Sequence, residues 1–246
     1  MDDDGAPDPW LPRLVLFDLD DTLCDYAASR MERLRIAFSG PNAAAQPPRD
    51  LVERMIADSV ETQAHGIEHF PDLFARHGVS DPAAADWAGR WYRDNPFHGL
   101  RMFPAVDDIV QSVRAWGGER PTRIGIVTNG PAALQRAKID LLGVDGLADF
   151  ALVSGEFGSW KPDRAIFEEA LRLGGADADD ALMVGDSLEH DIAGANDAGL
   201  RTVWVNRAGR KRAAGTPDPS HEISDLGDLL WLPREWERAA NPNSGR

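Results

Sequence analysis

The sequence predicts an α/β protein with a parallel β-sheet and an inserted helical segment. Five short apolar runs rich in β-branched residues alternate with helical patterns, an order typical of parallel sheets. One long stretch after the first run has almost no strand signal. The chain has 246 residues, of which 43% are hydrophobic, so it is long enough to bury a core without disulfides.

The predicted strands are almost continuously apolar rather than alternating, which favours strands that are covered on both faces. The predicted strands are Leu14–Asp20, Arg123–Asn129, Phe150–Ser154, Ala181–Asp186 and Arg201–Asn206.

Helices are predicted between the later strands because each of these segments has a plausible start and a glycine at its end. Two of them begin with proline in the first turn. The predicted helices are Pro131–Leu142 before Gly143, Pro162–Leu173 before Gly174, and Leu188–Ala198 before Gly199. The segment Asp107–Trp116 returns to the same α/β pattern.

The segment 24–104 has almost no strand signal and is predicted to be a helical module inserted after the first strand. Apolar residues repeat at helical spacing from Leu51 to Val60, and a second helix carries Trp87 and Trp91 and ends before Pro96. We therefore predict a core of residues 10–23 and 105–240 and a helical domain of residues 24–104. Residues 1–9 and 241–246 are predicted to be disordered tails.

Composition excludes several classes of function. The net charge of −15 argues against a protein that binds nucleic acid through phosphates. The one short basic run, Arg207–Arg212, is interpreted as a solvated loop. Cys24 is the only cysteine, and no signal peptide or apolar membrane span is evident, so we expect a cytoplasmic protein without membrane contact. The oligomeric state cannot be predicted.

Asp18 and Asp20 follow the first predicted strand. Carboxylates two residues apart on an extended backbone lie on one face, and the carboxyl ends of parallel strands are where such folds bind ligands. One carboxylate can attack as a nucleophile while its neighbour transfers protons. The alternative is a cluster of surface aspartates in a turn.

Polar residues also follow the second strand and precede a later helix. Thr128, Asn129 and Gly130 at a helix entrance can bind phosphate, although threonine or asparagine there also serves as a helix cap. Lys161, before Pro162, can neutralise a phosphoryl group, although it can equally be an exposed loop lysine.

Asp186 ends an apolar strand, and Asp191 follows five residues later. Together with Asp18 they could not all ionise side by side without a cation. Oxygen ligands of this kind suit Mg²⁺. The alternative for Asp191 is an acid that stabilises the first turn of its own helix.

The order of these four motifs resembles the haloacid-dehalogenase-like (HAD) hydrolase superfamily. The motifs are Asp-x-Asp-x-Thr, Thr-Asn-Gly, Lys-Pro and Gly-Asp-Ser-x₃-Asp, and the resemblance extends from Leu14 to about Asn206. The surrounding sequence looks like the phosphatase branch with a helical cap inserted after the first motif. The resemblance implies a Rossmann-like core carrying an α-helical cap domain.

The resemblance also implies a role for each site residue. Asp18 would be the nucleophile that forms an aspartyl-phosphate, Asp20 the acid and base, and Lys161 the cation that shields charge between nucleophile and phosphate. Thr22 would fix the loop. Thr128 and Asn129, with Lys161, would bind the substrate phosphate. The implied Mg²⁺ ligands are Asp18, the Asp20 backbone carbonyl, Asp186 and Asp191.

The function expected from this resemblance is Mg²⁺-dependent hydrolysis of a small phosphorylated metabolite. The alternatives are a sugar phosphomutase, which would use the same core residues, a 2-haloacid dehalogenase, and a non-catalytic metabolite-binding module. Asp20 and Asp186 argue against the dehalogenase. That branch of the family lacks an acid at the position of Asp20 and needs no metal. Arg90, Arg93 and His98 are candidate substrate contacts in the cap.

Overall fold

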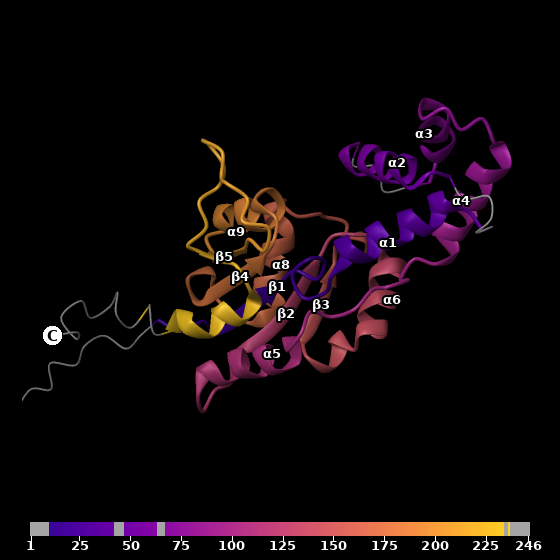
Figure 1. The fold of residues 1–246 in the computed structure, drawn as a ribbon. Helices are drawn as coiled ribbons and strands as arrows, with labels where there is room; N and C mark the ends of the chain where they lie inside the picture. The colour runs from indigo at the N-terminus through magenta and orange to yellow at the C-terminus, as the bar shows by residue number, and fades with distance from the viewer. Residues whose placement is uncertain (1–9, 42–46, 63–66, 234–235, 237–246) are drawn as a thin grey trace, which may run out of the picture. The chain divides into compact units, whose positions relative to one another are not determined.

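The computed structural model describes residues 10–41, 47–62, 67–233 and 236. The predicted tails at residues 1–9 and 241–246 lie outside the described residues. The chain divides into two compact units (Figure 1). The core unit comprises Met1–Cys24 and Met102–Arg246, and the helical unit comprises Asp25–Arg101.

The core unit contains a six-stranded, fully parallel sheet with strand order β3-β2-β1-β4-β5-β6. This confirms the predicted fold class. The last strand was not predicted, since it has only three residues and one of them is buried. The strands are β1 Leu14–Phe17, β2 Arg123–Thr128, β3 Phe150–Val153, β4 Ala181–Gly185, β5 Arg201–Val205 and β6 His221–Ile223.

Helices cover both faces of the sheet, with α8 and α9 on one face and α5 on the other (Figure 1). The α-helices of this unit are α5 Val106–Arg114, α6 Ala132–Leu142, α7 Ser154–Phe157, α8 Arg164–Gly174 and α9 Ala193–Asp197. Short helical turns are η2 Ala115–Gly117, η3 Val144–Gly146, η4 Ala178–Asp180, η5 Leu188–Ile192 and η6 Leu226–Trp231.

The central strand β1 is buried on both sides, as its continuous hydrophobicity predicted. Leu14 and Leu16 pack with Phe167 of α8 in the cluster between the sheet and α8 and α9. β1 pairs with β2 on one side and β4 on the other, and the strand order reverses at this point. In open parallel sheets, ligands bind beyond the carboxyl ends of the strands at such a reversal.

Two predicted helices differ from the structure in detail. The helix predicted from Pro162 begins at Arg164, because the Asp163 side chain accepts a hydrogen bond from the Ala165 N–H at 3.1 Å and caps the helix there. The helix predicted over 188–198 consists of a π-helical turn, η5, followed by α9, and Ser187 caps η5 by accepting from the His190 N–H.

The helical unit has a hydrophobic core of its own. Phe38 lies edge-to-face with Phe70 at 5.0 Å between ring centroids, and the Arg33 guanidinium lies 3.9 Å from the centre of the Tyr92 ring. Its helices are α1 Tyr26–Ser39, α2 Arg49–Glu61, α3 Phe70–Arg76 and α4 Pro82–Asp94. No helix among the described residues has both the length and the apolar character needed to cross a membrane.

Gly194 of α9 packs directly against the loop that carries Lys161. A Cβ at this position would lie 2.6 Å from the Pro162 carbonyl oxygen and 2.5 Å from Cε2 of Phe167. Backbone cannot yield as a flexible side chain can, and overpacking of this kind costs about 1–3 kcal/mol. We expect Gly194→Ala to lower the free energy of unfolding by that amount in urea denaturation.

Gly146→Ala is the matched control for this prediction. An added Cβ there meets no atom within 4 Å, so the same change of residue type should alter stability by less than about 0.5 kcal/mol. Equal midpoints for the two variants would contradict the packing argument.

Candidate active site

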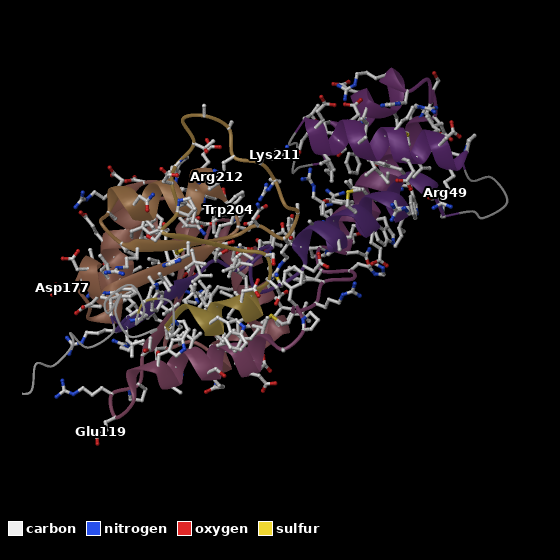
Figure 2. All side chains as sticks on the ribbon, turned by 60° about the vertical axis from the view of Figure 1, so that its left-hand side comes forward. Arg49, Glu119, Asp177, Trp204, Lys211 and Arg212 are labelled. Atoms are coloured by element: carbon white, nitrogen blue, oxygen red, sulfur yellow. The ribbon has the colours of Figure 1, made fainter. Side chains whose placement is uncertain are left out.

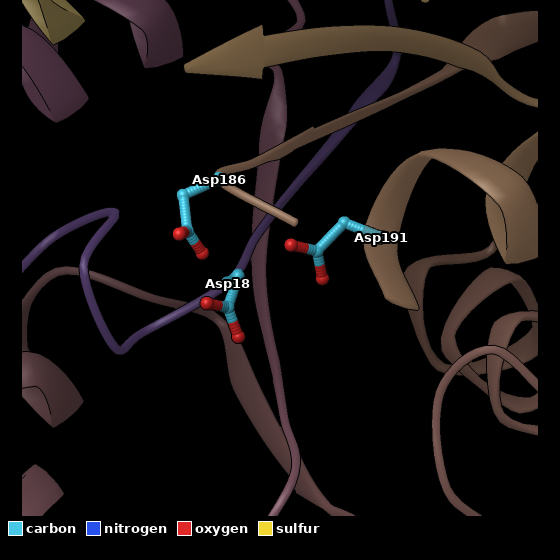
Figure 3. A group of neighbouring side chains, drawn as sticks. All are labelled: Asp18, Asp186 and Asp191. Atoms are coloured by element: carbon cyan, nitrogen blue, oxygen red, sulfur yellow. The ribbon is translucent and has the colours of Figure 1, made fainter. Parts of the chain in front are cut away.

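Three aspartates converge at the carboxyl end of the sheet. Asp18 follows β1, Asp186 follows β4, and Asp191 lies in η5. Figure 3 shows the three side chains gathered in one place, and one carboxylate oxygen of each lies within 4.8 Å of the others. The arrangement is an oxygen-only cluster, a donor set that suits a hard divalent cation.

The site raises the pKa values of two of these acids. Asp18 is only 7% exposed, and its backbone N–H donates to the Val184 carbonyl at 3.0 Å, which extends the β1–β4 pairing to the site. Burial raises the pKa of Asp18 well above its usual range, despite the opposing charge of Lys161. Burial, followed by the nearby charges of Asp191 and Asp21, raises the pKa of Asp186 to about 7.

Lys161 places one buried cation among these acids. Its Nζ lies 2.5 Å from Asp18 Oδ1 and 2.6 Å from Asp191 Oδ1, and the residue is 3% exposed. Burial opposes the charged ammonium, but the two carboxylates outweigh burial and raise the pKa of Lys161 above its ordinary value. Lys161 is therefore a fixed positive charge next to Asp18, and the alternative of an exposed loop lysine is wrong.

Asn129 fixes the backbone of Lys161. Its Nδ2 donates to the Lys161 carbonyl at 2.9 Å, and its Oδ1 accepts from the Lys161 N–H at 2.9 Å. Because Asn129 directly follows β2, these two bonds fix the position of the Lys161 backbone relative to the sheet. These contacts give the Asn129 side chain a positioning role, and its contact with a substrate phosphate stays a prediction.

Asp191 is held in place by its own turn. Its Oδ2 accepts from the Ser187 N–H at 3.0 Å, and the residue is 1% exposed. A Cβ on Gly185 would lie 2.3 Å from Asp191 Oδ2, so glycine leaves the room that this carboxylate occupies. Asp191 both stabilises the turn, as the alternative interpretation held, and pairs with Lys161.

Asp20 contacts two side chains of helix α6. Both of its carboxylate oxygens lie 2.7 Å from Nζ of Lys138. Gln135 donates to Asp20 Oδ2 at 3.3 Å and also to the hydroxyl of Thr128. Gln135 therefore links Asp20 to Thr128, the predicted phosphate ligand, by a hydrogen bond to each.

The basic run that we interpreted as a solvated loop contacts the site at two points. Arg207 donates to the Thr22 carbonyl at 2.9 Å, and Arg210 donates to the Asp186 carbonyl at 2.9 Å. Trp204, whose indole lies inside the core unit, donates to the same Asp186 carbonyl (Figure 2). The interpretation holds for Arg210, Lys211 and Arg212, which are exposed, although Arg210 reaches the Asp186 carbonyl. It is wrong for Arg207, which is half-buried.

Sequence reasoning did not identify Gln135, Lys138 or Arg210. The sequence did contain a pattern that points to Gln135 and Lys138. Gln135 and Lys138 are three residues apart on one face of the helix that follows Thr-Asn-Gly, the face that also carries the buried Ile139. Polar side chains on a buried helix face need partners. For Arg210, no comparable pattern existed.

The three predicted cap contacts belong to the helical unit, and each lies next to an acid of that unit. Arg90 pairs with Asp86, Arg93 Nε lies 4.0 Å from an Asp94 carboxylate oxygen, and His98 Nε2 lies 3.3 Å from Glu32 Oε1. Their contact with a substrate stays a prediction.

Known proteins resemble this chain over most of its length. Glyceraldehyde 3-phosphate phosphatase from Methanopyrus kandleri is 31% identical over 245 residues, covering 91% of this chain and 97% of the relative. Phosphoserine phosphatase from Thermus thermophilus is 30% identical over 245 residues, covering 89% of this chain and 98% of the relative.

Solved structures agree on the fold. The HAD hydrolase YfnB from Bacillus subtilis, solved with magnesium, superposes with a TM-score of 0.72 at 23% identity, covering 90% of this chain and 98% of that chain. The 2-haloacid dehalogenase from Pseudomonas syringae has a TM-score of 0.58 at 28% identity, covering 92% of this chain and 100% of that chain.

The sequence family described as haloacid dehalogenase-like hydrolase matches residues 12–199. This match covers more than half of the chain and includes all seven predicted site residues. It confirms the resemblance inferred from the four motifs. The chain belongs to the haloacid dehalogenase-like hydrolase family.

Proposed function

We propose that this protein is a Mg²⁺-dependent phosphomonoester hydrolase that acts on a small phosphorylated metabolite through an aspartyl-phosphate at Asp18. The observation that carries the proposal is the ion pair between Asp18 and the buried Lys161, within a cluster of carboxylates at the sheet edge. The relatives named as phosphatases of glyceraldehyde 3-phosphate and phosphoserine support the substrate class.

In the first step, an Asp18 carboxylate oxygen attacks the phosphorus of the substrate. A bond forms between Asp18 and phosphorus, and the bond from phosphorus to the alcohol oxygen breaks. Asp20 gives its proton to the departing oxygen. Lys161 lies beside the attacking carboxylate, where its charge offsets repulsion between that carboxylate and the phosphate dianion.

In the second step, a water molecule attacks the phosphorus of the aspartyl-phosphate. Asp20 takes the proton of that water, the bond between Asp18 and phosphorus breaks, and inorganic phosphate leaves. The same carboxyl group therefore acts first as an acid and then as a base, and it returns to its starting state. Asp20 is suited to this work because it lies two residues beyond Asp18 on the same loop.

The residues of the site fit a magnesium ion. Asp18, Asp186 and Asp191 offer carboxylate oxygens within one ion's reach, and no softer ligand belongs to the cluster. Burial raises the pKa values of Asp18 and Asp186, and repulsion from neighbouring acids raises them further, so a bound cation would favour their ionised forms. When bound, Mg²⁺ supplies charge neutralisation and orients the phosphoryl group.

A phosphomutase would use the same residues and differs only in the acceptor of the phosphoryl group. Product analysis with wild-type protein and a panel of sugar phosphates, phosphoserine and nucleotides separates the alternatives. Free phosphate with an intact alcohol supports the proposal. An isomerised sugar phosphate, or halide release from 2-haloacids without phosphate release from any ester, would replace it with the mutase or the dehalogenase.

Replacement of the nucleophile should abolish turnover. We expect Asp18→Asn to lower kcat on an aryl phosphate by at least about a thousandfold, because the amide cannot form the acyl phosphate. The exposed Asp177, labelled in Figure 2, provides the matched control Asp177→Asn, which should retain wild-type activity. Full activity in Asp18→Asn would remove the mechanism.

The pKa of Asp186 predicts how magnesium binding varies with pH. In the unfolded chain the pKa of this carboxyl group is near 4, and in the folded protein it is about 7. Its contribution to the free energy of unfolding is therefore fully present below about pH 4 and is lost as pH rises through about 7. Cation binding needs the ionised form. We therefore expect the gain in melting temperature on adding Mg²⁺ to be larger at about pH 8 than at about pH 5.

The matched variant for this measurement is Asp186→Asn, which removes the titrating group. Its magnesium-dependent gain should be small at both pH values. EDTA treatment of the wild type should abolish phosphatase activity, and added Mg²⁺ should restore it. Equal thermal gains at the two pH values in the wild type would count against Asp186 as a ligand.

A further inference from the structure

We propose that Lys138 and Gln135 of α6 are positioning residues that hold the Asp20 carboxyl group in the orientation from which it transfers protons. This inference rests on the proposed function, because it assigns a cause to the position of the acid in that mechanism. The assignment depends on contacts within the core unit only. Neither residue belongs to the four motifs that identify the family.

The use of lysine in this chain is unusual. Of its 26 basic residues only three are lysines, namely Lys138, Lys161 and Lys211. Lys138 and Lys161 are buried against the aspartates of the first motif, and Lys211 is exposed on the loop after β5 (Figure 2). Lysine is a compact cation on a flexible stem, whereas arginine presents a wide planar fork. Two of the three lysines of the chain thus lie buried beside these aspartates.

The contact between Lys138 and Asp20 fixes the carboxylate at both of its oxygens. Lys138 is 2% exposed, and its Nζ lies 2.7 Å from each oxygen of Asp20. Because one ammonium reaches both oxygens, rotation of the carboxylate away from it would lose two charge-assisted hydrogen bonds at once. Leaving a buried ammonium without this partner would be costly.

Gln135 joins Asp20 to the phosphate-binding end of β2. Its Nε2 donates to Asp20 Oδ2, to the Thr128 hydroxyl and to the Asn129 carbonyl. Gln135 is 1% exposed, and Gly130 makes room for it, since a Cβ there would lie 2.7 Å from Gln135 Cγ. A phosphoryl group bound at Thr128 would therefore have Asp20 Oδ2 as a near neighbour.

If Lys138 and Gln135 position the acid, replacing either residue should slow a substrate more when its leaving group needs a proton. An alkoxide leaves poorly without protonation, whereas 2,4-dinitrophenolate is stable as an anion. Because kcat/KM reports the steps up to departure of the leaving group, it isolates the acid role of Asp20 from its later role as base. A merely structural role of Lys138 would slow both substrates equally.

The experiment compares kcat/KM for an alkyl phosphate and for 2,4-dinitrophenyl phosphate, with Mg²⁺ present, in wild type, Lys138→Met and the control Lys211→Met. For Lys138→Met we expect a loss of about tenfold or more on the alkyl ester and less than about threefold on the dinitrophenyl ester. Lys211→Met should equal the wild type on both, since Lys211 is exposed. Gln135→Met, which keeps the length of the side chain, should show the same selectivity as Lys138→Met and serves if that variant does not fold.

A double-mutant cycle completes the test. In an Asp20→Asn background the carboxylate is absent, so adding Lys138→Met should change neither rate by more than about threefold. Equal losses on both esters in the single variant, or additive losses in the double variant, would overturn the inference while leaving the proposed function in place. A wild-type protein without activity on either ester would instead overturn the proposed function and, with it, this inference.

Discussion

The site depends on one physical constraint. Carboxylates brought together in a buried place repel one another unless a positive charge lies beside them. Lys161 supplies that charge through its contacts with Asp18 and Asp191. A buried ion pair gains little over apolar packing, so its value lies in what it holds in position. Neighbouring residues hold the partners of this ion pair in place. Asn129 fixes the backbone of Lys161, and Gly185 leaves space for the Asp191 carboxylate.

Two aspartates only two residues apart have different surroundings. Asp18 lies beside Lys161 and the two acids of its cluster, one after β4 and one within η5. Asp20 instead faces Lys138 and Gln135 of α6. Neighbouring carboxyl groups with different environments can take different chemical roles, one as nucleophile and one as acid and base. The tight loop after β1 produces this separation, since the Asp21 N–H donates to the Cys24 carbonyl and turns the chain back.

The fold class and the meeting of the strand-end residues could be predicted because both follow from local patterns. Continuous apolar runs identify buried parallel strands, and parallel strands bring their carboxyl ends to one edge. Asp18 and Asp186 were therefore expected to be neighbours. The predicted strands nevertheless ran too long, since the polar residues assigned to their last positions lie just beyond them, as Asp186 lies beyond β4.

What could not be predicted depends on contacts between distant residues. The contact of Lys138 with Asp20 joins residues far apart in the sequence, and no local pattern specifies it. The start of α8 was set by Asp163 rather than by Pro162, a choice between two adequate helix starts. The compartment and the boundaries of a cap stay predictions from the sequence.

The central claim is that Asp18 becomes covalently attached to phosphorus. Rapid quenching in acid during turnover, followed by borohydride reduction, converts an aspartyl-phosphate into homoserine. Trypsin releases Asp18 in the single peptide 14–30, between Arg13 and Arg30. The account predicts homoserine at position 18 of that peptide, in the presence of substrate only. An active enzyme whose peptide 14–30 keeps aspartate at position 18 under these conditions would contradict it.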